Sequence, residues 1–156
     1  MEFLYLTWDE AAKLSEKLSE KIDFTPDILV GISRGGLVPV RILSDKMGIG
    51  NIGVMGIGFY KSVGQTSKFP QITQELSKDV EGKKILVVDD VADTGRSLVV
   101  AKEYLRRKKA AEIKIATLHY KPASQLKPDY FMDTTTKWIV YPWEQYEVER
   151  ELKEKK

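Results

Sequence analysis

A short apolar run that ends in carboxylates most strongly constrains the fold of this chain. Residues 85–97 read ILVVDDVADTGRS, so four apolar side chains lead into Asp89 and Asp90, and Asp93 follows three residues later. A bounded apolar run of this length predicts a buried strand. One Asp in this place would simply begin a loop and cap a helix. Three carboxylates at the carboxyl end of a strand favour a ligand site, because ligands bind there in open α/β sheets.

Strand-like and helix-like segments alternate along most of the chain. Strands are predicted over residues 27–32, 51–60, 84–89 and 112–119, and amphipathic helices over 8–22, 37–47 and 94–109. Segment 61–77 has no clear period and is predicted to be a long mobile loop. Beyond Lys121, prolines separate short aromatic segments, which indicates a small appended flap. The alternation predicts an α/β fold with a twisted, mostly parallel sheet flanked by helices.

Length and composition restrict the class of protein. A chain of 156 residues fits a single domain over 1–156, and a net charge of +2 gives no general reason to bind nucleic acid or membrane. No apolar run approaches the roughly 18 residues of a membrane span, and no signal peptide is recognisable, so we expect a cytoplasmic protein. With no cysteine and one histidine, His119, any metal is expected to be hard and oxygen-bound. His119 itself is predicted to be structural.

The residues after the carboxylates suit a phosphate. The run from Thr94 to Ser97 places hydroxyls and free N–H groups at a predicted helix N-terminus, where the helix dipole favours anions. Asp89 and Asp90 would repel that phosphate, so their own partner is predicted to be sugar hydroxyls, Mg²⁺ or both. The segment therefore predicts a ligand with a phosphate beside a polyol, and a phosphorylated ribose meets that description.

The segment VVDDVADTGRS resembles the phosphoribosyl pyrophosphate (PRPP) signature of type I phosphoribosyltransferases. GISRGG resembles the pyrophosphate loop of that family, and HYKPAS followed by KWIVYPWE resembles the purine-binding hood of its 6-oxopurine members. These motifs keep the family's order between about Asp27 and Glu144. The resemblance implies the type I phosphoribosyltransferase fold and a pentosyltransferase of purine salvage. Such an enzyme transfers the phosphoribosyl group of PRPP to hypoxanthine, guanine or xanthine and releases pyrophosphate.

The resemblance also implies roles for individual residues. Asp89 and Asp90 would hold the ribose hydroxyls, directly or through Mg²⁺, and Asp93 would be the general base at the purine N7. Glu144 matches an acidic position near a second Mg²⁺, where relatives more often have Asp. The PRPP signature comprises Asp89, Asp90, Ala92, Asp93, Thr94, Gly95, Arg96 and Ser97. The pyrophosphate loop comprises Ser33, Arg34, Gly35 and Gly36, with a non-proline cis peptide expected next to Arg34.

A base-binding hood is implied over about residues 121–145. Within it, Lys121 would donate to the purine O6, Trp138 would stack on the base, and backbone groups around Ile139 would read the exocyclic position. Without the motif, Trp138 would more simply be a core residue and Lys121 a solvated surface residue. The resemblance also implies a homodimer and a lid over the reacting carbon. The lid contacts would be Tyr60, Lys61 and Ser62.

Other classes of protein share parts of this pattern. ILVVDD also resembles the acidic start of receiver domains, but that acidic pair begins the domain, whereas 84 residues precede Ile85 here. A regulator could keep the fold and sense PRPP or nucleotides without catalysis. Such a regulator needs no intact hood, and the chain has neither a helix-turn-helix extension nor a strong basic excess. The P-loop motif of nucleotide kinases and GTPases is absent.

Overall fold

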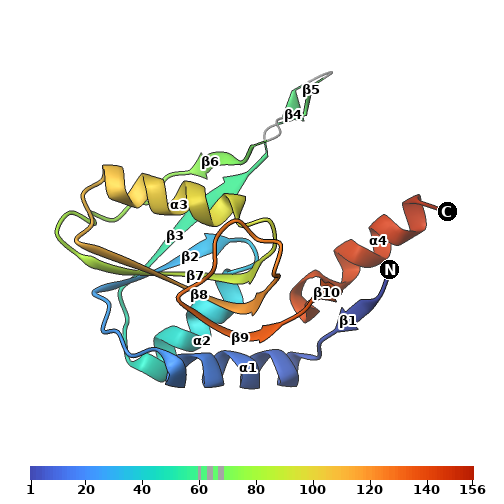
Figure 1. Ribbon diagram of the computed structural model, residues 1–156, viewed down its shortest axis with the longest axis horizontal. Helices are drawn as coiled ribbons and strands as arrows, with labels where there is room; N and C mark the ends of the chain where they lie inside the picture. Colours follow the sequence, from blue (N-terminus) through green and yellow to red (C-terminus); the bar gives the residue numbers. More distant parts are fainter. Residues whose placement is uncertain (60, 63–64, 67–68) are drawn as a thin grey trace.

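The computed structural model describes residues 1–59, 61–62, 65–66 and 69–156. Its centre is a six-stranded sheet in the order β6-β3-β2-β7-β8-β9 (Figure 1). The strands are β2 (Ile28–Ser33), β3 (Ile52–Gly58), β6 (Gln71–Gln74), β7 (Lys84–Ala92), β8 (Glu112–Tyr120) and β9 (Tyr130–Thr134). Only the β3-β6 pair within this sheet is antiparallel. The predicted α/β fold with a mostly parallel sheet is confirmed.

Helices cover both faces of this sheet. They are α1 (Trp8–Lys21), α2 (Leu37–Met47) and α3 (Arg96–Arg107). α1 and α2 lie on one face and α3 on the other (Figure 1). In β7, Ile85 and Val87 pack in the core cluster that contains α3 residues, whereas Leu86 and Val88 pack with those of α1 and α2. A strand buried on both faces needs apolar residues at every position, which explains the continuous run before Asp89.

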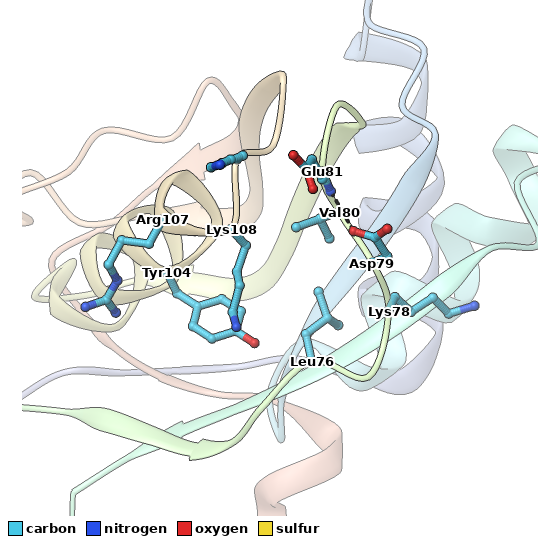
Figure 2. Close-up of a pocket in the computed structure, with 9 residues that line it drawn as sticks. Leu76, Lys78, Asp79, Val80, Glu81, Tyr104, Arg107 and Lys108 are labelled. Atoms are coloured by element: carbon cyan, nitrogen blue, oxygen red, sulfur yellow. Dashed lines mark hydrogen bonds between the residues drawn. The ribbon is translucent and has the colours of Figure 1, made fainter.

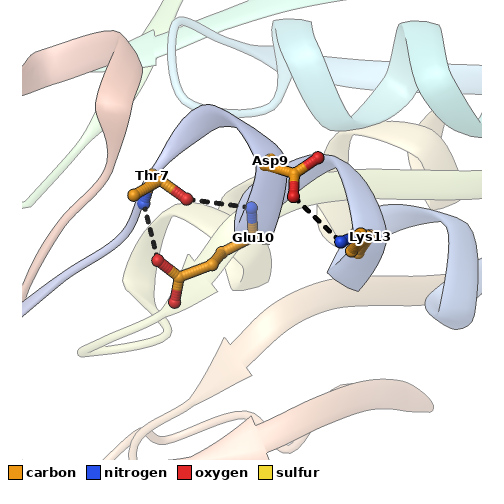
Figure 3. Close-up of polar contacts among 4 residues, drawn as sticks. All are labelled: Thr7, Asp9, Glu10 and Lys13. Carbon is orange, nitrogen blue, oxygen red and sulfur yellow. Dashed lines mark hydrogen bonds and ion pairs between the residues drawn. The ribbon is translucent and has the colours of Figure 1, made fainter.

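The start of α1 is fixed by its own side chains (Figure 3). The Thr7 hydroxyl accepts a hydrogen bond from the Glu10 N–H at 3.1 Å, and the Glu10 carboxylate accepts one from the Thr7 N–H at 3.3 Å. This capping box satisfies two backbone groups at the helix end. One turn on, Lys13 and Asp9 form an exposed ion pair of 2.9 Å. The capping box thus fixes the start of α1 at Trp8, two residues beyond Leu6 and three beyond the end of β1.

Shorter elements lie outside the main sheet. They are β1 (Phe3–Tyr5), β4 (Lys61–Ser62), β5 (Gln65–Thr66), β10 (Trp138–Val140), the 3-10 helix η1 (Pro142–Glu144) and α4 (Gln145–Glu154). β4 and β5 form an antiparallel hairpin, and β1 pairs in parallel with β10. β1 and α4 project from the body of the molecule together, so the two ends of the described chain are neighbours (Figure 1).

Two predictions about the smaller elements are wrong. Segment 61–77 is not one irregular loop, since it contains β4, β5 and β6. β6 reads QITQ and lies at the sheet edge with only Ile72 partly buried, so it lacks the apolar alternation that marks a strand. β9 belongs to the main sheet, where it pairs with β8, rather than to a separate flap. α4 was not predicted, because Val148 is its only buried residue.

β7 also extends three residues beyond its predicted end. It continues to Ala92 because it keeps pairing with β8 as far as Tyr120. Asp89 and Asp90 therefore lie within the end of the strand, whose backbone holds them in place. Among the residues that the structure describes, no helix has the length and apolar character needed to cross a membrane.

Candidate active site

A cavity of about 710 Å³ opens at the carboxyl ends of β2, β3 and β7. It is lined by Ile32, Ser33, Arg34, Gly35, Leu37, Val38, Ile57, Gly58, Thr73, Asp89, Asp90, Ser97, Trp143, Glu144 and Glu147. The structure thus brings together parts of four predicted groups: the pyrophosphate loop, the acidic pair, the predicted second metal position and, through Ser97, the phosphate loop.

The glycine loop, which is the predicted pyrophosphate loop of residues 33–36, packs directly against the end of β7. A Cβ atom on Gly35 would overlap the carboxylate of Asp90, and one on Gly36 would overlap the carbonyl oxygen of Val88. The close approach therefore requires glycine at both positions. The peptide bond between Ser33 and Arg34 is cis, as predicted for this loop.

The acidic pair is held by main-chain and indole donors. Asp90 is 8% exposed, and its two carboxylate oxygens accept hydrogen bonds from the Val91 N–H (2.8 Å) and the Trp143 Nε1–H (3.3 Å). The Asp90 N–H donates to the Asp89 carboxylate at 2.8 Å. Burial raises the pKa of Asp89 well above its ordinary value, and the neighbouring Asp90 charge raises it further. Burial also raises the pKa of Asp90, although the Trp143 hydrogen bond opposes this. A bound cation, or hydroxyl groups that donate hydrogen bonds, would stabilise the ionised carboxylates and so lower these raised pKa values.

Three aromatic residues that sequence reasoning did not assign to the site lie behind the acidic pair. The Tyr141 hydroxyl donates to the main-chain carbonyl of Asp90 at 3.0 Å and lies 2.8 Å from Nδ1 of His119. Tyr141 stacks on Trp143 with ring centroids 4.8 Å apart and planes inclined by 7°. Burial lowers the pKa of His119, and the charge of Asp133 opposes this shift. The only sequence signal was the spacing of two aromatics, Tyr141 and Trp143, around a proline.

Two glutamates approach the cavity from the C-terminal part of the chain. Burial raises the pKa of Glu144 to about 7, with a further contribution from the charge of Asp90. Glu147 was not predicted: both its oxygens accept hydrogen bonds from the same guanidinium nitrogen of Arg34, at 2.9 and 3.0 Å. The Arg34 side chain is largely exposed, so this ion pair is a weak one that an incoming phosphate could displace.

The predicted phosphate loop is pinned by the segment that follows β8. Gly95 has a φ of +81° and lies so close to Ser124 that a Cβ atom would overlap the Ser124 hydroxyl. The Thr94 carbonyl accepts from the Gln125 N–H at 2.9 Å, and the Ala92 carbonyl from the Lys121 N–H at 3.0 Å. These contacts bring the two predicted motifs together.

Arg96, at the start of α3, lies against an aromatic ring from the segment after β5. Its guanidinium is 5.6 Å from the ring centroid of Phe69. Of the predicted lid contacts, Tyr60 lies outside the described residues, and Lys61 and Ser62 form β4 of the hairpin that precedes Phe69. The lid assignment stays a prediction.

The residues predicted to bind the base form a second cluster. The Lys121 ammonium lies 3.5 Å from a carboxylate oxygen of Asp93 and 5.6 Å from the ring centroid of Trp138. Trp138 is 43% exposed, so the alternative reading of a core tryptophan is wrong. These three residues do not line the cavity of the acidic pair, although Asp93 follows Asp90 by only three positions.

The backbone of Ile139 faces away from β1. The Trp138 N–H donates to the Glu2 carbonyl at 2.9 Å, and the Val140 carbonyl accepts from the Leu6 N–H at 3.1 Å. In a parallel pair, a residue between two such bonded residues directs its own N–H and C=O to the opposite edge. The Ile139 side chain is buried in the core. Its N–H and C=O are therefore left unpaired by β1, and the predicted role of this backbone in reading the base stays a prediction.

Another cavity, of about 370 Å³, lies at the opposite end of β7 (Figure 2). Leu76, Val80 and Tyr104 contribute apolar surface to it, whereas Lys78 and Arg107 point away from one another. It contains none of the predicted site residues, and its lining residues 78–81 come shortly before β7 begins at Lys84. We assign no chemistry to it.

The mostly parallel sheet, with an acidic pair and a glycine loop at its carboxyl edge, is the arrangement that the resemblance to phosphoribosyltransferases predicts. The family model for the phosphoribosyl transferase domain matches residues 6–150, and the chain belongs to that family. It is similar to the solved structure of a purine phosphoribosyltransferase from Pyrococcus horikoshii, with 41% identity and a TM-score of 0.83 over 92% of this chain and 94% of that one.

Two curated relatives are also named as purine phosphoribosyltransferases. One is the xanthine-guanine phosphoribosyltransferase of Nitratidesulfovibrio vulgaris, 31% identical over 89% of this chain and 83% of its own length. The other is the hypoxanthine-guanine phosphoribosyltransferase of Schizosaccharomyces pombe, 30% identical over 94% of this chain and 91% of its own length. The predicted family is confirmed, and membership of it excludes the receiver domain.

Proposed function

We propose that this protein is a purine-salvage enzyme that transfers the phosphoribosyl group of PRPP to a 6-oxopurine. One observation carries the proposal: the glycine loop and the acidic pair line a single cavity, and the Asp93–Lys121–Trp138 cluster begins three residues beyond that pair. The relatives named above act on xanthine, hypoxanthine and guanine according to their names, which supports the choice of base.

The cavity side is proposed to bind PRPP. Asp89 and Asp90 would accept hydrogen bonds from the ribose hydroxyls, because ionised carboxylates are acceptors only. The loop from Thr94 to Ser97 would donate to the 5-phosphate at the start of α3. The glycine loop would bring its backbone close to the pyrophosphate, and Arg34 would exchange Glu147 for the pyrophosphate oxygens.

Mg²⁺ is the cofactor that the donor set fits best. Asp89 and Asp90 offer hard oxygen ligands whose pKa values are raised by burial, so a cation would stabilise their ionised forms. Within the described residues, no group of three or more acidic or histidine side chains is arranged to hold a metal by itself. Mg²⁺ is usually bound in this way, with one or two carboxylates from the protein and its other ligands from substrate oxygens and water. When bound, Mg²⁺ would neutralise charge on the pyrophosphate; Glu144 is proposed as the position nearest a second ion.

The base side is proposed to orient the purine for attack at the anomeric carbon. Trp138 would stack on the purine, Lys121 would donate to O6, and the Ile139 backbone would read the exocyclic position. Asp93 would accept the proton at N7 as the base becomes bonded to the ribose. The acidic pair would stabilise the positive charge that develops on the ribose ring when pyrophosphate leaves.

Wider features of the enzyme are also part of the proposal. We propose a single domain over residues 1–156, with residues 121–145 supplying most of the hood. A homodimer and a cytoplasmic location are proposed from the family and from its purine-salvage members. Nucleic acid and membrane are not proposed as partners, because the net charge is only +2.

A base-by-base assay tests the function. Purified protein is given PRPP and Mg²⁺ with hypoxanthine, guanine, xanthine, adenine or orotate in turn, and nucleotide and pyrophosphate are measured. We expect turnover with at least one 6-oxopurine and little with adenine or orotate. Omission of PRPP is the control. Retained nucleotide binding with no turnover of any purine would contradict the proposal and favour the non-catalytic regulator.

A further inference from the structure

A buried polar chain leads from the centre of the sheet to the acidic pair. His119 and Tyr141 are each 1% exposed, and burial of their polar atoms is costly unless those atoms are hydrogen-bonded. The Tyr141 hydroxyl meets this need at two points: it donates to the Asp90 carbonyl at 3.0 Å, and it lies 2.8 Å from Nδ1 of His119.

The direction of these hydrogen bonds follows from the number of protons. A phenol has one proton, and in this geometry it goes to the Asp90 carbonyl, which can only accept. Nδ1 of His119 must therefore donate to the phenol oxygen, which assigns the neutral ring its Nδ1–H tautomer. The Thr117 hydroxyl donates to the His119 carbonyl at 2.8 Å and fixes this part of β8. The orientation of the Tyr141 hydroxyl is thus set from the core.

A second contact links the same ring to the Asp90 carboxylate. Tyr141 stacks on Trp143, and the Trp143 Nε1–H donates to Oδ2 of Asp90 at 3.3 Å. The Val91 N–H donates to Oδ1 at 2.8 Å. Asp90 is therefore held at its carbonyl and at both carboxylate oxygens. Because a carboxylate oxygen accepts more than one hydrogen bond, each oxygen keeps capacity for a ligand in the cavity.

We propose that Tyr141, oriented by His119 and stacked on Trp143, is a positioning residue that fixes Asp90 for PRPP. This inference rests on the proposed function. It adds a role for residues that act on the substrate through Asp90. We expect the effect mainly on PRPP, because the hydrogen bonds of the Tyr141 hydroxyl go to Asp90 and His119.

Tyr141→Phe removes the hydroxyl and keeps the ring stack. The buried Asp90 carbonyl then loses its donor, and we expect the KM for PRPP to rise about tenfold. The KM for the purine and kcat should stay within about twofold of wild type. Tyr130→Phe is the control, since its hydroxyl donates to Asp23 at 2.6 Å in an exposed contact between β9 and the segment just after α1, with no part in the Asp90 network. A residue with a purely structural role would lower kcat through loss of active protein and leave both KM values alone.

A pair of His119 variants isolates the upstream donor. His119→Asn keeps an N–H donor near the position of Nδ1, and His119→Leu removes it. We expect the Leu variant to raise the KM for PRPP as Tyr141→Phe does, and the Asn variant to recover at least half of the loss on a logarithmic scale. Failure of Asn to differ from Leu would contradict an orienting role for His119.

The indole N–H of Trp143 gives a readout that needs no turnover. In a nitrogen–proton NMR spectrum of the metal-free protein, Trp143→Phe identifies its resonance. That resonance should shift in Tyr141→Phe and His119→Leu, and stay in place in His119→Asn and Tyr130→Phe. An unmoved resonance together with an unchanged KM for PRPP would overturn the proposal, as would equal rises in both KM values.

The two proposals fail in different ways. If wild-type protein converts no purine, the proposed function fails, and PRPP affinity by calorimetry replaces KM in the comparison of Tyr141→Phe with Tyr130→Phe. If wild type is active and those two variants match in both KM and resonance, the positioning role fails alone. If Tyr141→Phe does not fold, the His119 pair decides the outcome by the same two measurements.

Discussion

The two sides of the candidate site are built differently. The side proposed to bind PRPP is part of the core: Asp90 is 8% exposed, fixed by three hydrogen-bond donors, and covered by Gly35. The side proposed to bind the base lies nearer the surface: Trp138 is 43% exposed and the Asp93 side chain 56% exposed, and only the Lys121 side chain, at 16%, is largely covered. On the proposed assignment, substitutions at the side that serves every base should also cost fold stability, whereas substitutions at the base-recognition side should change function with little effect on folding.

The largest effect is expected on the exposed side, in turnover alone. Asp93→Asn removes the proposed general base, and kcat should fall about 100-fold or more. Because the Asp93 side chain is 56% exposed, the free energy of unfolding should change little, and PRPP affinity should fall less than turnover. Steady-state kinetics and calorimetry measure these quantities. Asp45→Asn, at an exposed position of α2, is the control; wild-type turnover in Asp93→Asn would remove the base assignment.

A smaller effect, but one on both function and stability, is expected at the buried side. Gly35→Ala places a methyl group against the Asp90 carboxylate. Overpacking of this kind costs about 1–3 kcal/mol, so kcat/KM for PRPP should fall about 10- to 100-fold and denaturant unfolding should occur earlier. Gly50→Ala is the control, because no atom lies within 4 Å of a Cβ there. If both variants match wild type in kcat/KM for PRPP and in unfolding, Gly35 is not tightly packed against Asp90.

Trp138→Ala should separate recognition from stability. Loss of an aromatic stacking surface costs about 1–3 kcal/mol in base binding, so the KM for the purine should rise about tenfold. The KM for PRPP should not move, and unfolding should change by less than about 0.5 kcal/mol. Tyr146→Ala, at another exposed aromatic, is the control. Equal losses for both substrates would show that the two sides are not independent.

The smallest expected effect is a dependence of the free energy of unfolding on pH. It involves Glu144, which lines the cavity of the acidic pair. The pKa of Glu144 is raised by burial to about 7 from 4.5. A carboxyl group with a raised folded-state pKa stabilises the fold most below its unfolded pKa, and this stabilisation is lost as pH rises through the folded value. Because Glu144 is only partly buried, solvent screens much of this effect, and between these two pH values wild type in EDTA should lose on the order of 1 kcal/mol relative to Glu144→Gln.

Urea titrations of both proteins at several pH values measure that difference. Glu144→Gln is the informative comparison because Asp89 and Asp90 remain in both proteins and contribute to both curves. Parallel curves for the two proteins would show that Glu144 keeps an ordinary pKa.

The sequence predicts those parts of the site that depend on local pattern. Asp89 and Asp90 follow a run whose apolar residues reveal a strand buried on both faces, and Gly35 and Gly36 separate a strand from a helix. Each of these signals lies within one strand–loop–helix unit. The resemblance then supplied the roles of Lys121 and Trp138, whose proximity to Asp93 local patterns do not encode.

The remainder depends on contacts between distant segments. Tyr141 and Trp143 reach Asp90 across separations of 51 and 53 residues, and nothing in their own segment indicates that destination. Glu147 reaches Arg34 across 113 residues from a helix that buries a single side chain. β1 is only three residues long, and its partner β10 is equally short, so neither has enough residues to show a period.

The pairing of β1 with β10 has a practical consequence for anyone who handles this protein. Phe3 lies in register with Trp138, and Glu2 accepts the Trp138 N–H. Shortening the chain by a few residues at Met1, or fusing an affinity tag there, alters the support of the strand proposed to select the base. We expect such a preparation to keep the central sheet, to which β1 does not belong, and to differ from the untagged protein in its preference among purine bases.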